Sequence, residues 1–173
     1  MKKLFLLLTM VIAFSATMNA QRIVFVDTER VLESMPAYQE AQKEIDQITQ
    51  QWQEDIQRKY GEIDEMYRAY QAEEVLLTDE LRQQRQDQII EKEKELKEYQ
   101  KKKFGYQGDL YKKRQELVKP IQDQIYETIS TMAKRKAYDI VLDKSSGVSI
   151  LFASEEYNKT CEIMEGLGLS CEE

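Results

Sequence analysis

Apolar residues in the first half of the chain recur at steps of three or four positions. Charged and amide side chains separate these apolar residues, which are Ile45, Ile48, Trp52, Ile56, Tyr60, Ile63, Tyr67 and Tyr70. This spacing places them in one narrow stripe along a helix, as in a coiled coil. A stripe so narrow cannot be buried by its own helix, so the pattern predicts a partner helix.

A second stripe follows a short interruption at residues 72–81. Thr78 there is a good N-cap residue, and it predicts a tight turn near residues 76–77 followed by a new helix. Positions 89, 96, 103, 110 and 117 lie seven apart, and Lys103 is the charged member of this series. The pattern predicts an antiparallel coiled-coil hairpin over residues 37–116, in which the numbers of facing residues add up to about 153. The second stripe consists of Leu81, Ile89, Leu96, Tyr99, Tyr106, Leu110 and Leu117.

Gly105 and Gly108 lie inside the second stripe, although each glycine costs a helix interior roughly 1 kcal/mol relative to alanine. Because the stripe continues to Leu117, we expect the helix to continue through both glycines. Two interpretations stay open. The glycines can allow close packing against Ile45 or Ile48, or they can form a hinge that lets the hairpin bend. We expect replacement of both by alanine to stabilise the helix.

The two ends of the chain are richer in apolar residues. Residues 22–27 predict a buried strand, followed by a short helix capped by Asp27 or Thr28 and by a new helix starting at Pro36. A dense apolar face after residue 117 predicts a helix that ends near Lys136. Residues 139–143 and 148–153 then predict a β-hairpin, and residues 155–166 a short helix.

These elements predict an α+β protein that is mostly α, with the hairpin of residues 37–116 projecting from a small β-strand body of residues 21–36 and 117–173. A core drawn from so few residues is thin, so we expect homo-oligomerisation to cover the strand edges. The candidate core and oligomer residues are Ile23, Phe25, Ile125, Ile129, Met132, Ile140, Leu142 and Ile150.

The first twenty residues have the layout of a secretory signal peptide. Lys2 and Lys3 precede a 13-residue apolar run, and a polar patch ends at Ala20, where we expect cleavage. The alternative is an uncleaved N-terminal anchor. The mature chain then has 23 basic and 32 acidic residues, which argues against nucleic-acid binding and against attraction to an anionic membrane.

The sequence contains few of the residues that catalysis or metal binding would need. The chain has no histidine and no glycine-rich phosphate loop, so we expect neither an enzyme nor a cofactor. Cys161 and Cys171, the two cysteines, form either a disulfide, which an exported protein allows, or a pair of free thiols. Two thiols without histidine make an incomplete zinc shell, so we expect no metal site.

The order of these features resembles the Skp (OmpH) family of periplasmic chaperones. The resemblance rests on the strand ending in Val26 and Asp27, on RVLESMP at residues 30–36, and on the long charged helices. It rests also on LVKPIQDQIYETISTMAKRKAYDIVLDKSSGVSILFAS, and its most specific part is residues 117–153. It implies a homotrimer whose helical hairpins enclose a cavity that holds unfolded outer-membrane proteins without ATP. Studied family members are basic, whereas this chain has a pI of about 4.9, so lipopolysaccharide binding is doubtful and no such site is transferred.

Some of the apolar residues of the hairpin are candidates for contact with a client. Adaptable methionine and aromatic side chains suit weak, unspecific binding. We expect Trp52, Tyr67, Tyr70, Tyr99 and Tyr106 to seal the two helices, and we take as client-contact candidates Met66, Phe104, Tyr111 and the turn residues Val75, Leu76 and Leu77. The alternative function is a structural coiled-coil scaffold or adaptor of the cell envelope, which would bind a folded partner and ignore unfolded chains.

Overall fold

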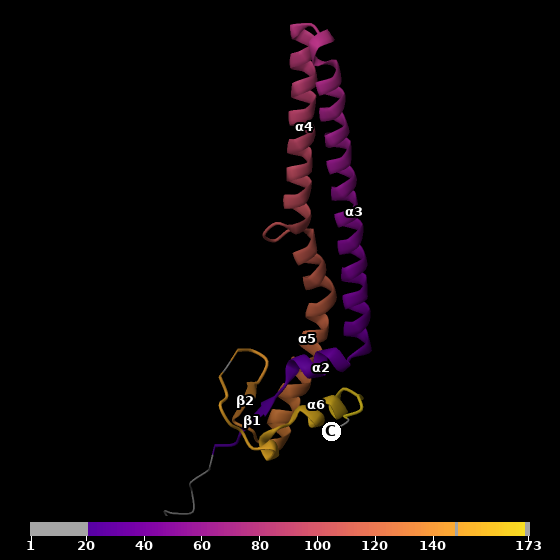
Figure 1. Ribbon diagram of the computed structural model, residues 1–173. Coiled ribbons are helices and arrows are strands. Elements are labelled where there is room, and N and C mark those ends of the chain that lie inside the picture. The colour runs from indigo at the N-terminus through magenta and orange to yellow at the C-terminus, as the bar shows by residue number, and fades with distance from the viewer. Residues whose placement is uncertain (1–20, 148, 172–173) are drawn as a thin grey trace, which may run out of the picture. The chain divides into compact units, whose positions relative to one another are not determined.

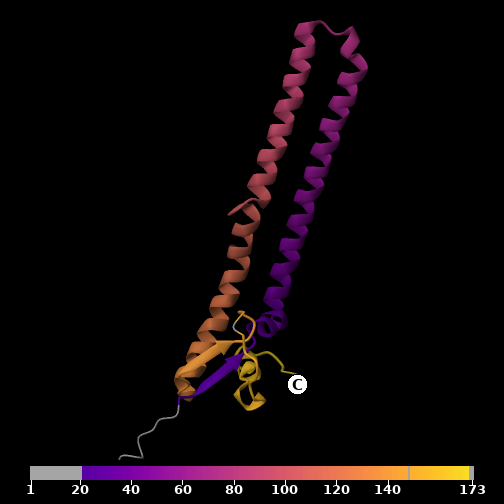
Figure 2. The same ribbon diagram turned by 60° about the vertical axis from the view of Figure 1, so that its left-hand side comes forward.

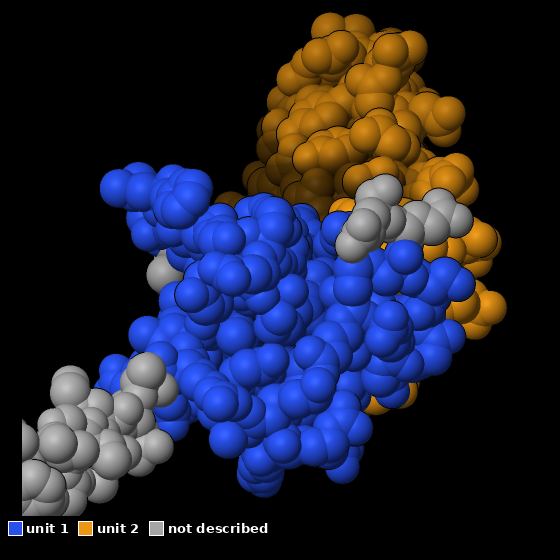
Figure 3. All heavy atoms as spheres, turned by 90° about the horizontal axis from the view of Figure 1, so that it is seen from below, with its two compact units in different colours: residues 1–31, 125–173 blue, residues 32–124 orange. Residues whose placement is uncertain are grey.

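The structure is a computed structural model that describes residues 21–147 and 149–171 (Figure 1). The predicted signal peptide, residues 1–20, lies outside the described residues. The chain divides into two compact units, coloured separately in Figure 3. Unit 1 combines Met1–Val31 with Ile125–Glu173, and unit 2 is Leu32–Gln124.

A two-stranded parallel sheet lies at the centre of unit 1. Strand β1 (Ile23–Val26) pairs with β2 (Ile140–Asp143), with Ile23 opposite Ile140 and Val26 opposite Asp143. Phe25 also forms an isolated parallel bridge with Asn158, so β1 has hydrogen-bonded neighbours on both sides. Parallel strands cannot be joined by a tight turn. The connection between β1 and β2 is correspondingly long, and it contains the whole of unit 2.

Three helices contribute buried side chains around this sheet. They are α2 (Thr28–Ser34), the last part of α5 (Asp109–Lys136) and α6 (Thr160–Gly166). The Asp27 carboxylate accepts the backbone N–H of Arg30 at 3.1 Å, which confirms the predicted helix start. The buried apolar residues of unit 1 are Val24, Phe25, Val26, Val31, Ile125, Met132, Ile163 and Met164.

The predicted β-hairpin over residues 139–143 and 148–153 is wrong, because residues 149–153 form no strand. Residue 148 itself lies outside the described residues. Strand β2 pairs with β1 instead, and the N–H of Lys144 extends this pairing by donating to the carbonyl of Val26 at 2.8 Å. The Asp143 carboxylate then turns the chain by accepting the backbone N–H of Ser145 at 3.0 Å.

The predicted helix over residues 155–166 is divided into the 3₁₀ turn η2 (Glu155–Tyr157) and α6. Asn158 causes the division, because its extended backbone bridges to Phe25 of β1. Its side-chain oxygen accepts the backbone N–H of Thr160 at 3.1 Å. A continuous helix could not place Asn158 at the edge of the strand.

Unit 2 contains the antiparallel pair α3 (Pro36–Glu73) and α4 (Asp79–Phe104), which lie side by side in Figures 1 and 2. The 3₁₀ turn η1 (Glu74–Leu76) joins them, and the Thr78 hydroxyl accepts the N–H of Leu81 at 3.4 Å. The predicted hairpin turn is therefore confirmed. The apolar seam consists of Ile56, Ile63, Ile89 and Leu96, with Met66, Tyr70 and Tyr99 packed against it.

The numbers of facing residues in the hairpin add up to slightly more than expected. The hydrogen-bonded pair Tyr99 and Asp55 has residue numbers that add up to 154, and the pair Tyr67 and Glu93 has numbers that add up to 160. The expectation of about 153 placed the turn at residues 76–77. The residues that connect the two helices, 74–78, are centred on residue 76, so the turn itself lies where it was expected.

The second helix of the hairpin is interrupted, so the prediction of a continuous helix through Gly105 and Gly108 is wrong. Helix α4 ends at Phe104 and α5 begins at Asp109. We call residues 105–108 the elbow. Its loop projects from the helices on the side away from α3 (Figures 1 and 2). Two backbone hydrogen bonds close the elbow. The N–H of Gly105 donates to the carbonyl of Lys101 at 2.8 Å, and the N–H of Gly108 donates to the carbonyl of Gly105 at 2.9 Å.

Candidate functional site

The turn of the hairpin carries the most exposed of the client-contact candidates. Val75 is 88% exposed and Leu76 is 83% exposed, whereas Leu77 is half-buried. The backbone N–H of Leu77 donates to the carbonyl of Glu74 at 3.4 Å and closes the 3₁₀ turn. The turn therefore presents two neighbouring aliphatic side chains to solvent.

A shallow groove of about 380 Å³ lies between α3 and α4 close to this turn. Met66, Ala69, Tyr70 and Ile89 are its apolar lining. Met66 is half-buried and packs against the seam, so part of its side chain contributes to the contact between the two helices. The remaining lining residues are acidic on α3 and basic on α4: Glu62, Glu65, Arg85 and Lys92. The groove thus offers a narrow apolar surface with charged groups on both sides.

Close backbone packing explains why the elbow contains glycine. A side chain at Gly105 would meet the carbonyl oxygen of Lys101, and a Cβ at Gly108 would lie 2.8 Å from the carbonyl oxygen of Lys102. Gln107 between them has φ of 54°, in the left-handed region that few residues adopt. Alanine at either glycine would push backbone atoms apart, so this geometry favours destabilisation by alanine over the stabilisation expected from helix propensity.

Lys103 crosses the junction between α4 and α5. Its Nζ lies 2.8 Å from Oδ2 of Asp109, at the start of α5, and 4.3 Å from the centre of the Trp52 ring on α3. The hydrogen bond from Lys103 holds the pKa of Asp109 below its ordinary value. Lys103 thus occupies an apolar position of the stripe by placing its cation on an aromatic ring and beside a carboxylate.

The aromatic candidates around the elbow differ in their surroundings. Phe104 is 36% exposed and packs edge-on against Trp52, with ring centres 5.9 Å apart, while Tyr111 is 50% exposed. Tyr106 was expected to seal the helices, and this expectation is wrong. It is 96% exposed because it belongs to the elbow loop and not to a helix.

Tyrosine hydroxyls link the two arms of the hairpin. Tyr67 donates to Glu93 at 3.0 Å, and Tyr99 donates to Asp55 at 3.0 Å. Asp55 also accepts a bond from Arg58 at 2.6 Å, and Arg58 first and Tyr99 second lower the pKa of Asp55. Burial is the main cause of the raised pKa of Tyr99. These bonds fix the facing positions of the arms.

The candidate core residues of unit 1 fall into two groups. Phe25, Ile125 and Met132 are buried in the single chain. Ile129, Leu142 and Ile150 are half-buried, and Ile23 and Ile140 are each 42% exposed. A groove of about 840 Å³ lies on this side of the sheet, and Ile23, Leu142, Ile150, Phe152 and Tyr157 are among its lining residues.

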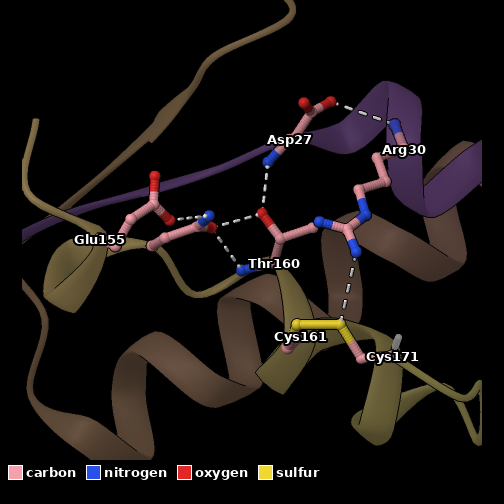
Figure 4. The surroundings of a disulfide bond; sticks show 7 residues. Asp27, Arg30, Glu155, Thr160, Cys161 and Cys171 are labelled. Carbon is pink, nitrogen blue, oxygen red and sulfur yellow. Dashed lines mark hydrogen bonds between the residues drawn. A yellow bond between two sulfur atoms is a disulfide. The ribbon is translucent and has the colours of Figure 1, made fainter. Parts of the chain in front are cut away.

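Cys161 and Cys171 are joined by a disulfide that closes the C-terminal segment onto α6 (Figure 4). Their Cα atoms lie 5.3 Å apart. Thr160, the neighbour of Cys161, is 1% exposed, and its hydroxyl accepts the backbone N–H of Asp27 at 2.9 Å. The disulfide therefore lies beside the contact that holds α6 against the end of β1.

No helix in residues 21–147 or 149–171 is long and apolar enough to cross a membrane. Within the same residues, no group of three or more histidine, cysteine, aspartate or glutamate side chains could hold a metal ion.

The observed elements define an α+β protein, mostly helical, in which a long antiparallel hairpin connects the two strands of a small parallel sheet. The family described as "outer membrane protein (OmpH-like)" matches residues 22–167, and the chain belongs to this family. No curated protein sequence matches the chain.

A solved structure from Caulobacter crescentus has the same fold. That protein is assigned as an OmpH-like outer membrane chaperone. It superposes with a TM-score of 0.68 over 86% of this chain and 84% of its own length, at 12% sequence identity. At this level of identity the likeness concerns the fold.

Proposed function

We propose that this protein is an ATP-independent holdase chaperone of the periplasm. It binds unfolded outer-membrane proteins in a cavity between the helical hairpins of a homotrimer and prevents their aggregation. Membership of the OmpH-like family supports this function, as does the chaperone assignment of the Caulobacter protein with the same fold. The observation that carries the proposal is the exposure of Val75 and Leu76 at the end of a long charged hairpin.

The physical basis is a surface of many weak contacts. A holdase must cover apolar segments of a client without fixing them in one arrangement. The aliphatic turn, the shallow Met66 groove and the exposed aromatic residues near the elbow offer such contacts, spread along a charged surface that stays soluble. An exposed apolar patch of this kind is typical of an interaction site.

Each segment of the chain has its own part in the proposed function. Residues 1–20 direct export and are removed after Ala20. Residues 21–36 and 117–173 form the trimerising body, and residues 37–116 form the client-binding hairpin. Net negative charge gives no reason to add lipopolysaccharide as a ligand.

Native mass tests the proposed function directly. Residues 21–173 are measured by light scattering, alone and after a urea-unfolded outer-membrane barrel protein has been diluted into them. We expect a trimer that gains the mass of one client and keeps it in solution. A trimer that leaves the client to precipitate would contradict the holdase function and favour the scaffold.

A paired variant tests the turn. Val75→Ser with Leu76→Ser removes exposed apolar surface without touching the seam, so we expect unchanged unfolding and weaker suppression of client aggregation. Tyr126→Ser is the matched control, because Tyr126 is 74% exposed but lies in unit 1. Equal suppression by the turn variant and the control would show that the turn does not bind clients.

A further inference from the structure

The elbow concentrates positive charge in an acidic chain. Residues 101–114 contain six basic residues and one acidic residue, although the whole chain has a net charge of −7. Lys103 and Lys113 form ion pairs within the hairpin. The other four basic side chains are exposed and take part in no ion pair among the described residues: Lys101, Lys102, Lys112 and Arg114.

Two tyrosines accompany these cations. Tyr106 is 96% exposed and Tyr111 is 50% exposed. The elbow holds Tyr106 in solvent by a backbone that requires glycine at 105 and 108 and a positive φ at Gln107. Tyrosine combines apolar contact area with a hydrogen-bonding hydroxyl, which suits it to interfaces. We call these two tyrosines and the four unpaired cations the elbow patch.

Helix α3 carries the opposite charge. Its residues 36–73 contain nine acidic and four basic residues. Glu40, Asp46 and Glu54 are exposed, and none of them forms an ion pair among the described residues. We call these three carboxylates the acidic face of α3.

Within one hairpin, few ion pairs join the opposite charges of the two arms. Among the described residues two ion pairs join the arms, Lys113 with Glu44 at 3.1 Å and Arg85 with Glu73 at 3.9 Å. The elbow loop projects away from α3 (Figures 1 and 2), and among the described residues none of the four cations of the patch pairs with Glu40, Asp46 or Glu54. Each hairpin therefore keeps one basic and one acidic surface available for another molecule.

We propose that the elbow patch of one copy docks on the acidic face of α3 in a second copy. One chain carries both halves of this contact, so the contact is heterologous and can close into a ring. Glu44 lies beside Lys113, and Trp52 beside Phe104, so the two surfaces share one level along the hairpin. If the copies are related by rotation about an axis parallel to the hairpins, the elbow patch of one copy lies at the same height as the acidic face of the next copy.

The strength of this contact follows from its chemistry. Exposed ion pairs are individually weak and are screened by salt. Several of them together with two tyrosines give a contact that forms at low salt and opens at high salt. Docking of neighbouring hairpins would then set how far apart they stand, independently of whether a client is present.

Carbodiimide coupling tests the contact, because this reagent joins a lysine to a carboxylate only where the two groups touch. Unlabelled and nitrogen-15-labelled chains are unfolded, mixed, refolded and coupled. Hybrid cross-links then identify contacts between copies. We expect hybrid links from Lys101, Lys102 or Lys112 to the acidic face of α3, and roughly tenfold fewer in about 0.5 M NaCl. The link between Lys113 and Glu44 within one chain serves as an internal standard.

Charge reversal supplies the matched variants. Lys101→Glu with Lys102→Glu should remove most of the hybrid links, whereas Lys94→Glu with Lys97→Glu changes the charge equally outside the elbow patch and should leave them. Adding Glu40→Lys and Asp46→Lys to the elbow variant should restore hybrid links in the reversed sense.

Three results would overturn the proposal. The first is the absence of hybrid links while the internal standard forms, and the second is hybrid links that survive reversal of the elbow. The third is links that appear only with an unfolded client or an anionic lipid vesicle, which would make that molecule the occupant. Client capture is measured separately on uncoupled protein, so failure of the holdase function is distinguishable from failure of the docking contact.

Discussion

Among single residues, Lys103 joins α4 to α5 through its ion pair with Asp109. Its side chain and that of Asp109 are 17% and 26% exposed, so their ion pair is better shielded than most pairs on the hairpin. The same cation lies over Trp52 of the opposite arm. We expect Lys103→Met to lower the free energy of unfolding by about 1 to 2 kcal/mol, measured by urea titration, because it removes both interactions.

Lys97→Met is the control for this change, since Lys97 is exposed and forms no ion pair among the described residues. The pH dependence separates the two contributions. Lys103 lowers the pKa of Asp109, so the ion pair stabilises the fold above the unfolded-state pKa of about 3.9 and is lost as pH falls through the folded-state pKa. A stability difference that is unchanged from neutral to strongly acid pH would assign the effect to the Trp52 contact alone.

The glycines of the hairpin should respond to alanine in opposite directions. A Cβ at Gly108 would lie within 3.0 Å of three backbone carbonyl oxygens, whereas a Cβ at Gly61 would meet nothing within 4 Å. We expect Gly61→Ala to stabilise α3 by about 1 kcal/mol and Gly108→Ala to destabilise unit 2, both measured by thermal unfolding. Stabilisation by both substitutions would mean that the elbow straightens into helix at little cost.

The seven-residue spacing explains why Tyr106 was wrongly predicted to be buried between the helices. The spacing assigned Tyr106 to the buried stripe, and it correctly assigned Ile89 and Leu96. Periodicity assumes an unbroken helix, and the interruption depends on close packing of Gly105 and Gly108 against carbonyls of α4. That packing is a property of the folded backbone. The residues that could have indicated the interruption from the sequence were the two glycines and the charged Lys103 in the apolar stripe.

Among the elements, α6 depends most on support from elsewhere in the chain. It has seven residues, too few for a stable isolated helix, yet Ile163 and Met164 are among the most buried side chains of unit 1. The disulfide between Cys161 and Cys171 restricts the unfolded segment of which α6 is part. We expect loss of this bond to cost unit 1 about 2 to 3 kcal/mol.

Hydrogen exchange with and without dithiothreitol measures this cost locally. The N–H of Lys159, which donates to the carbonyl of Phe25, should exchange faster after reduction, while amides of α4 in unit 2 should not change. A Cys161→Ser, Cys171→Ser chain should resemble the reduced protein and ignore the reductant. Equal protection of Lys159 in all three samples would mean that packing alone holds α6.

The elements were predictable to different degrees. The stripes, Thr78 and Pro36 determined α3, η1 and α4 from local signals, and the apolar face of residues 118–132 determined the end of α5. The partner of β2 was not predictable locally. Residues 139–143 pair with a strand more than a hundred positions earlier, and a parallel pairing leaves no turn signature in the sequence.

At the scale of the whole molecule, the sheet of unit 1 is too small to cover its own apolar surface. Two strands are below the number that usually gives independent stability. Leu151 is 99% exposed and Phe152 is 88% exposed beside the groove that also contains Ile23 and Ile150. Large apolar side chains exposed in this way are typical of an interface. This surface, with the half-exposed Ile23 and Ile140, is where we expect copies of the chain to meet.

Leu151→Ser with Phe152→Ser should lower the native mass of the mature chain toward that of a single copy, because it removes apolar area that only association would bury. Light scattering over a dilution series measures the change. The turn variant Val75→Ser with Leu76→Ser is the control, since it removes similarly exposed side chains from unit 2 and should keep the wild-type mass. An unchanged mass in both variants would mean that the copies associate through other surfaces, and the carbodiimide links at the elbow would then be the first place to look for them.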